Sequence, residues 1–192
     1  MNDRRLANGQ SVQGRSPRVL AIAQRRRWRN RYNSVIPGRP RAGPSFPDGD
    51  PMARIQIDLP GHFCFATEIA IYINHINYGN HLDNTALLAL VSEARVRFFK
   101  SLGYSELDVE GVGIIVADAA VQYRSEAFHG EVLVFSLTAH DFNRYGCDLV
   151  WQVAERDSGR EVARGKHGII FFDYAARKPA PVPPAFAARF AG

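Results

Sequence analysis

Apolar residues at helical spacing mark the stretch between residues 84 and 102. Six positions recur at intervals of three and four: Leu87, Leu90, Val91, Ala94, Phe98 and Leu102. This spacing places them on one face of a helix of about five turns. Asp83 or Asn84 can cap its start, and Gly103 is of the type that commonly ends a helix. The pattern therefore predicts one long amphipathic helix.

The other apolar positions fall in short runs typical of strands. One run precedes the helix and four follow it: 64–74, 111–124, 131–140, 147–155 and about 161–174. Gly130 and Gly159 provide turns between the later runs. The stretch KPAPVPPAF then ends the last strand, because proline cannot continue a ladder. The order β–α–β–β–β–β predicts an α+β domain, with one helix packed on five antiparallel strands.

Residues 1–51 lack this periodicity and are rich in Arg and Pro, which is typical of a disordered extension. They hold 11 Arg and 3 Asp, whereas residues 52–192 hold 13 basic and 16 acidic side chains. The basic excess thus belongs to the extension and not to the domain at 52–192. RRRWRNR, with Trp28, could contact nucleic acid or anionic lipid. We favour an extension without such a partner, because Met52 would be a natural start for the domain.

Composition also bears on the compartment. No apolar run approaches the roughly 20 residues that cross a bilayer, and Val19–Ala23 is too short for the core of a secretory signal. An organellar presequence, which shares the Arg-rich bias, remains an alternative. Cys64 and Cys147 are too few for a disulfide scaffold or a structural zinc site. We expect a cytoplasmic protein that does not bind membranes.

A dense polar stretch, NHINYGNHLDN, directly precedes the helix. It holds two His, one Asp and four Asn within residues 74–84. A metal site built from His75, His81 and Asp83 is disfavoured, because their spacing matches no helical ligand pattern and sulfur ligands are absent. Serine-hydrolase chemistry is disfavoured, because the sequence has no G-x-S-x-G motif. A dinucleotide site is equally unsupported, because Gly-Val-Gly at 111–113 lacks a third glycine and precedes a strand.

Several motifs in order resemble those of hotdog-fold thioesterases of the 4-hydroxybenzoyl-CoA and acyl-CoA or acyl-carrier type. They are HINYGNHLDNTALLALVSEAR at 75–95, VQYR at 121–124, FHGE at 128–131, EVARGK at 161–166 and FFD at 171–173. The resemblance spans about 62–186. It implies a hotdog fold, in which a five-stranded antiparallel sheet wraps around one central helix.

The resemblance also implies a function. The chain is expected to be an acyl thioesterase of fatty acid metabolism, with coenzyme A or an acyl carrier present only as part of its substrate. It is expected to form a homodimer or a dimer of dimers, with an acyl tunnel at the subunit interface. Leu87, Leu88 and Val91 could line that tunnel or belong to the core.

Three positions depart from the family pattern. Asn77 stands where many members carry a catalytic Asp, and His75 stands at an earlier Asp position. Ser125 replaces a common Pro, which concerns the stiffness of a turn. Asn cannot act as a base or a carboxylate nucleophile. A base, if one exists, must therefore come from another residue.

Four residues are the catalytic candidates: Asn77, His81, Asp83 and Glu93. The N–H groups at the helix start would polarise the thioester carbonyl. Glu93 would act as base toward water, Asn77 would orient water or substrate, and His81 would donate to the oxyanion. Each has a structural alternative: Glu93 pairs with Arg97, His81 and Asn77 stabilise the loop, and Asp83 caps the helix.

Arg124, Arg164 and Lys166 would lie on strands near the site and could bind the phosphates of the carrier. Their alternative is a solvated strand face. Two rival functions also remain. A hydratase or dehydratase on the same fold would use His81, paired with Glu93, as base on carbon. A non-catalytic acyl-CoA-binding protein would account for the missing carboxylate at Asn77.

Overall fold

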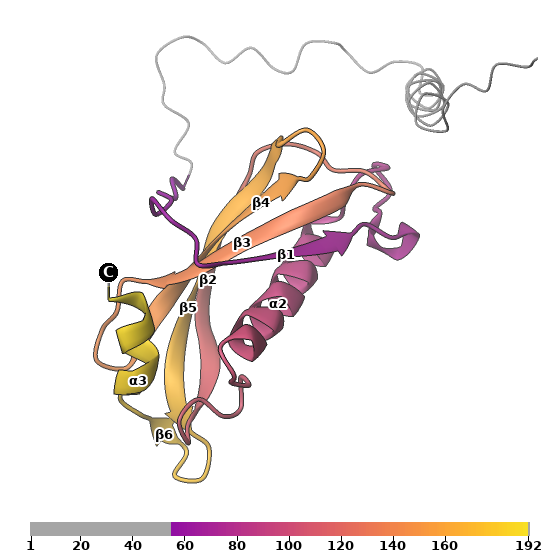
Figure 1. Ribbon diagram of the computed structural model, residues 1–192. Coiled ribbons are helices and arrows are strands. Elements are labelled where there is room, and N and C mark those ends of the chain that lie inside the picture. Colours follow the sequence, from indigo (N-terminus) through magenta and orange to yellow (C-terminus); the bar gives the residue numbers. More distant parts are fainter. Residues whose placement is uncertain (1–54, 192) are drawn as a thin grey trace, which may run out of the picture. The chain divides into compact units, whose positions relative to one another are not determined.

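A computed structural model describes residues 55–191. The extension expected at residues 1–51 and the domain start at Met52 lie outside these described residues. Within them the chain forms one antiparallel sheet, one long helix and a short C-terminal helical segment (Figure 1).

The strands and helices occur in the predicted order. They are β1 (Phe65–Ala70), the 3-10 turn η1 (Ile73–His75), α2 (Asn84–Ser101), β2 (Gly113–Tyr123), β3 (Val132–His140), β4 (Gly146–Glu155), β5 (Glu161–Asp173), β6 (Lys178–Pro179), α3 (Pro184–Ala187) and the 3-10 turn η2 (Ala188–Phe190). The sheet order is β1-β3-β4-β5-β2, and β6 pairs with the end of β5. The expected α+β class and the five antiparallel strands are confirmed.

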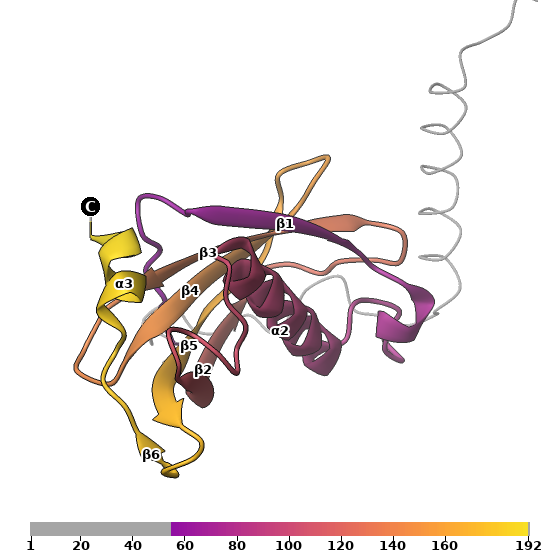
Figure 2. The ribbon, with the colours of Figure 1, turned by 60° about the horizontal axis from the view of Figure 1, so that its bottom comes forward.

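The helix α2 confirms the helical spacing of the sequence. Asp83 is its N-cap, and Gly103 follows it with φ +84°, a conformation that favours glycine. The buried side chains of α2 are Leu87, Leu90, Val91, Ala94, Phe98 and Phe99. In Figure 2 the helix lies across one face of the sheet, beneath β1 and β3, so its apolar face and the inner sheet face form one core.

The inner face of the sheet follows from strand alternation. On β4, Leu149, Trp151 and Val153 are fully buried. Their partners on β5 lie on the same face, since paired residues of antiparallel strands share a face. Lys166 alternates with the inward His167 and so lies on the outer face. The strand register thus decides which polar residues of β5 can approach the helix.

The first strand is shorter than the run at 64–74 predicted. β1 ends at Ala70 because its partner β3 begins at Val132, opposite that residue. Beyond it, the N–H of Ile71 donates to Glu131 O and the chain turns into η1. The residues after Ala70 therefore form the approach to the helix.

The C-terminal segment was not predicted beyond its prolines. Its helix α3 has Pro184 in the first turn. The N–H groups of a first turn have no acceptor within the helix, so the missing N–H of proline removes no hydrogen bond there. Phe186 of α3 is fully buried, and its ring packs against those of Phe99 and Phe171, at 5.9 and 5.3 Å between centroids. Phe190 of η2 adds to the group by packing on Phe98 and Phe186. These rings fill the space beside the C-terminal end of α2.

The strand β2 lies at one edge of the sheet and pairs only with β5 among the described strands. Its middle is unusually open: Val116, Ala117, Asp118 and Ala119 are all exposed. The ladder shifts register between Val116 and Asp118, which marks a β-bulge. One long sheet edge is thus left with unpaired backbone groups.

No helix within residues 55–191 is long and apolar enough to cross a bilayer. Cys147 is buried, and burial, followed by the charge of Asp148, raises its pKa to about 12. Cys64 is exposed. Neither cysteine is in a disulfide.

Candidate functional site

A pocket of about 350 Å³ opens at the N-terminal end of α2. Its lining comes from three segments: the polar loop and helix start, the loop after β2, and the start of β5. The lining residues are Asn77, His81, Leu82, Asp83, Asn84, Leu87, Tyr123, Arg124, Ser125, Glu126, Ala127 and Val162. Three of the four catalytic candidates, Asn77, His81 and Asp83, are therefore gathered in one cavity.

A tight turn presents Asn77 and His81 on the same side of the pocket. The N–H of Asn77 donates to His81 O at 2.9 Å, and that of Asn80 donates to Asn77 O at 3.0 Å. Asn80 has φ +64°, a left-handed conformation that Asn tolerates better than most residues. At Gly79 a Cβ would lie 2.9 Å from His81 Nε2, so a larger residue there would displace the His81 ring. Local turn chemistry thus fixes both side chains.

The ring of His81 is held through Nδ1. This atom lies 3.1 Å from Leu82 O and 3.5 Å from Asn77 Nδ2. A carbonyl oxygen only accepts, so the shorter contact places a proton on Nδ1. In the neutral ring Nε2 then carries none and can accept a proton.

Asp83 acts as the cap of α2, the role that the sequence offered as the alternative to catalysis. Its Oδ1 accepts from Thr85 N at 2.7 Å, from Thr85 Oγ1 at 2.5 Å and from Ala86 N at 3.3 Å. The hydrogen bonds from Thr85, and then that from Ala86, hold the pKa of this carboxyl below its usual value. A carboxylate so engaged is a poor proton acceptor at neutral pH.

The same contacts correct one expectation about the helix start. The sequence suggested that N–H groups there would be available to a thioester carbonyl. The Asp83 carboxylate instead occupies those of Thr85 and Ala86. Asn84, the first residue of α2, lines the pocket and precedes both, so its N–H is the remaining candidate donor of the first turn.

The opposite wall of the pocket is the segment Tyr123–Ala127, where β2 ends. The N–H groups of Arg124 and Ser125 both donate to Val162 O, at 2.8 and 3.1 Å. The carbonyl of Ala127 accepts from Leu82 N at 2.7 Å, which ties this wall to the polar loop. The two walls are therefore connected through the backbone.

Glu93 does not line this pocket. It lies nine residues beyond Asn84, which at 100° per residue is half a turn around the helix. Its carboxylate pairs with Arg97 Nε at 2.7 Å, and Arg97 also donates to Thr67 Oγ1 and Glu68 O of β1. Within one chain, Glu93 therefore lies on the β1 side of α2, in the surface pair that the sequence offered as its alternative role.

The three expected phosphate-binding cations differ in their partners, although Arg124 and Arg164 share Glu161. Arg124 lines the pocket, with its Nε 3.5 Å from Glu161 Oε2. Arg164 and Lys166 lie on the outer face of β5, away from α2, because they alternate with the inward His167. Arg164 is bound by Glu161 through two hydrogen bonds, and Lys166 pairs with Asp148. Within one chain, Arg124 lines this pocket and Arg164 and Lys166 do not.

The side chains of His75 and Asp83 are hydrogen-bonded to the backbone and do not converge on a metal site with His81. His75 Nδ1 accepts from Tyr72 N at 3.2 Å, while Asp83 is bound by the helix start. Among residues 55–191, no group of three or more His, Cys, Asp or Glu side chains is placed to hold a metal ion.

Comparison with known protein families identifies the family of this chain. Residues 71–190, more than half of the chain, match the family described as the thioesterase-like superfamily. The chain belongs to this superfamily. A search of the curated proteins finds no match.

Solved structures named as thioesterases share the hotdog fold described above. A 1,4-dihydroxy-2-naphthoyl-CoA thioesterase from Synechocystis is 18% identical, with a TM-score of 0.59 over 65% of this chain and 93% of that one. A DHNA-CoA thioesterase from Staphylococcus aureus is 18% identical, with a TM-score of 0.58 over 66% and 87%. A thioesterase from Thermus thermophilus, solved with coenzyme A and zinc, is 18% identical, with a TM-score of 0.58 over 68% and 100%.

The sequence did not identify every residue of this superfamily member's pocket. Tyr123 was expected in a strand and Ser125 in a turn, and Glu126 and Ala127 had no assignment, yet all four form a wall. The sequence indicates only that a turn lies near these residues. It does not indicate their hydrogen-bond partners, Leu82 and Val162, which are distant along the chain. Such long-range contacts depend on the sheet register.

Proposed function

We propose that this chain hydrolyses an acyl thioester, carried by coenzyme A or an acyl carrier, to the free acid and thiol. The observation that carries the proposal is the pocket at the start of α2, where Asn77 and His81 face a helix N-terminus in a thioesterase-like chain. The Synechocystis and Staphylococcus aureus neighbours are named for thioesters of coenzyme A, which supports the same class of bond here.

His81 is the base in this proposal. Hydrolysis needs a water molecule to lose a proton as it attacks the carbonyl carbon. Nε2 of His81 can take that proton, because the contact between Nδ1 and Leu82 O assigns the ring proton to Nδ1. Asn77, which cannot be a base, positions the water or the carbonyl through its side-chain amide.

The developing oxyanion is placed at the start of α2. The N–H of Asn84 is the donor, and the helix dipole favours negative charge at this end. The Asp83 carboxylate opposes this effect because it already lies on the Thr85 and Ala86 donors. We therefore propose a modest oxyanion site, with Asp83 in a capping role.

Glu93 takes no part as base in the pocket of its own chain, since it faces β1 and is paired with Arg97. The hydratase alternative needs His81 and Glu93 as a pair. Within one chain no observation favours it, because His81 lines the pocket and Glu93 pairs with Arg97 outside it. Arg124, half-exposed at the pocket wall, is the cation we propose for the phosphates of the carrier.

We also propose that two copies associate through β2. Its outer edge has unpaired backbone groups, and Val116 is 43% exposed beside it. A second β2 running antiparallel would continue the sheet across the pair. Light scattering should then give the mass of a dimer or a dimer of dimers, and Val116→Lys should lower it. A cytoplasmic location and a role in fatty acid metabolism stay predictions.

The function is tested with the full chain, a panel of acyl-CoAs and acyl-carrier thioesters, and a thiol reagent. We expect thiol release from at least one acyl group. His81→Gln should lower kcat/KM by about 100-fold or more, the usual contribution of a general base. Glu93→Gln is the matched control and should stay within about twofold of the unmodified chain.

Two results would contradict parts of this proposal. If Glu93→Gln abolishes release and His81→Gln does not, the base is Glu93, acting across a subunit interface. If no thioester is cleaved while acyl-CoA still binds, the chain is an acyl-thioester-binding protein, as the absence of a carboxylate at Asn77 would allow.

A further inference from the structure

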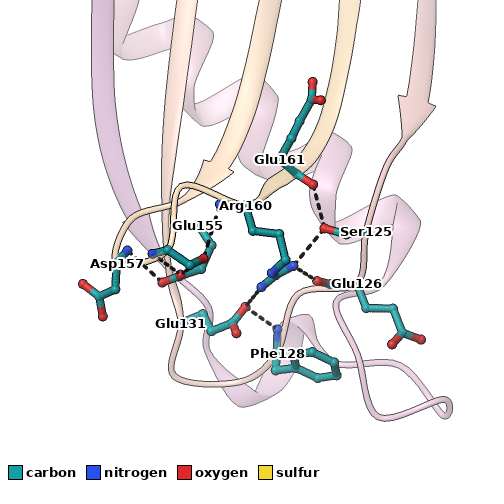
Figure 3. Close-up of polar contacts among 9 residues, drawn as sticks. Ser125, Glu126, Phe128, Glu131, Glu155, Asp157, Arg160 and Glu161 are labelled. Carbon is teal, nitrogen blue, oxygen red and sulfur yellow. Dashed lines mark hydrogen bonds and ion pairs between the residues drawn. The ribbon is translucent and has the colours of Figure 1, made fainter.

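Arg160 connects the hairpin between β4 and β5 to the loop after β2 (Figure 3). Its Nη1 donates to Ser125 Oγ at 2.9 Å and to the carbonyl of Glu126. Its Nη2 lies 2.8 Å from Glu131 Oε2. One guanidinium thus contacts three residues that lie about 30 positions earlier in the chain.

The residues that it contacts belong to the pocket wall or hold it. Ser125 and Glu126 line the pocket, and Ser125 Oγ in turn donates to Glu161 O at 2.6 Å. Glu131 Oε2 accepts from the N–H of Phe128, the residue directly after the wall, at 3.1 Å. Arg160 therefore contacts the wall at Ser125 and Glu126 and stabilises it beyond that point through Glu131.

The wall needs such a partner because, after Tyr123, it is not part of a strand. β2 ends at Tyr123 and β3 begins at Val132, so the intervening carbonyls lack a regular ladder. A guanidinium offers several donors in a fixed plane, and hydrogen bonds to it are stronger than neutral ones. The side chains of Arg160 and Glu131 are only 29% and 16% exposed, which limits screening of their ion pair by solvent.

A second arginine of the same hairpin, Arg156, has its ion pairs outside the pocket wall. Arg156 pairs with Glu68 and with Asp157, both at 3.2 Å. Its partners lie on β1 and on the hairpin itself, away from the pocket wall. The hairpin therefore offers a matched pair, in which one arginine holds the wall and the other does not.

We propose that Arg160 is a positioning residue of the thioester pocket, which fixes the wall at Ser125 and Glu126 against β5 and the polar loop. The proposal rests on the proposed function for its effect on catalysis, but its effect on the wall can be measured without activity. Arg160 contacts the wall and not the reacting atoms. Its loss should therefore weaken substrate binding more than turnover.

The test compares Arg160→Met, Arg160→Lys and the control Arg156→Met in the full chain. Hydrogen exchange should be about tenfold faster across residues 124–131 and at the Leu82 amide in Arg160→Met, and unchanged there in the control. With a cleaved thioester, KM should rise about tenfold and kcat should change less than twofold. Arg160→Lys keeps the charge for Glu131 but not the planar set of donors, so KM should stay raised about threefold.

The two readouts separate the proposals. Faster exchange confined to the wall, with no thioester cleaved by the unmodified chain, would support Arg160 and refute the proposed function. Unchanged exchange in folded Arg160→Met would overturn the role of Arg160 whatever the activity. Faster exchange throughout α2 and β4 would overturn it as well, because Arg160 would then support the fold as a whole. An equal fall of kcat in Arg160→Met and Arg156→Met would also overturn the role of Arg160.

Discussion

The two ends of α2 differ in what surrounds them. At the N-terminal end the polar loop, the Asp83 cap and the wall after β2 leave a pocket of about 350 Å³. At the C-terminal end, aromatic rings of α2, α3 and η2 close the space between helix and sheet. One helix thus has an open polar end and a closed apolar end. The comparison suggests that the stability of the fold and the chemistry of the site can be altered separately.

The largest effect is expected at the closed end. Phe186→Ala removes a fully buried ring that contacts Phe99 and Phe171, so it should lower the free energy of unfolding by about 3–5 kcal/mol. Urea unfolding measures the loss. Leu107→Ala, at a position 74% exposed, is the control and should change it by less than about 0.5 kcal/mol. Loss of thioester cleavage by folded Phe186→Ala would show that the two ends are coupled.

The middle of the helix gives a pH-dependent effect. His167 of β5 is 4% exposed and accepts a hydrogen bond from Arg95 of α2 at 3.1 Å. Burial, and then the charge of Arg95, lowers its pKa from 6.5 to about 4. Between these pH values the unfolded chain binds a proton that the folded chain does not. The free energy of unfolding should therefore fall by up to about 3 kcal/mol as the pH falls from about 6.5 to 4.

His167→Gln should remove this part of the pH dependence, because the amide can accept from Arg95 and does not titrate. His129→Gln, at an exposed turn, should leave the curve unchanged. Urea unfolding at pH 7.5 and 4.5 compares the three proteins. If the free energy of unfolding changes equally with pH in all three proteins, the pKa of His167 is the same in the folded and unfolded chains, and the prediction is wrong.

The smallest effect is expected at the open end. Asp83→Ala removes the cap of α2 and should lower Tm by about 2–5 °C. Asp83→Asn keeps a capping side chain and should stay within about 1 °C. Calorimetry measures both. A fall in kcat/KM as large as that of His81→Gln, in Asp83→Asn as well as Asp83→Ala, would make Asp83 a catalytic group.

Much of the fold follows from local pattern. The helix was expected at 84–102 and forms at Asn84–Ser101, because its apolar spacing and its cap are local signals. The hairpin at 155–161 has Gly159 at φ +67° for the same reason. The closed end was not predicted, although Pro184 at a helix start was a usable signal. The packing of Phe186 depends on residues far away in sequence.

The site was only partly predictable. Asn77, His81 and Asp83 were found because they follow one another in a short loop. Glu93 was expected in the same site but does not line the pocket of its own chain, because a motif gives distance along the chain and not the side of the helix. Arg160 was missed because its partners are set by the strand register and leave no local pattern.

The sheet order has a consequence for synthesis of the chain. β3, β4 and β5 pair with sequence neighbours, but β2 pairs with β5, as Gly113 does with Phe172. At about 5–20 residues per second, β2 leaves the ribosome several seconds before its partner exists. During that time the apolar segment Gly113–Tyr123 has no strand to bind. We expect this segment to be where chaperones bind the nascent chain.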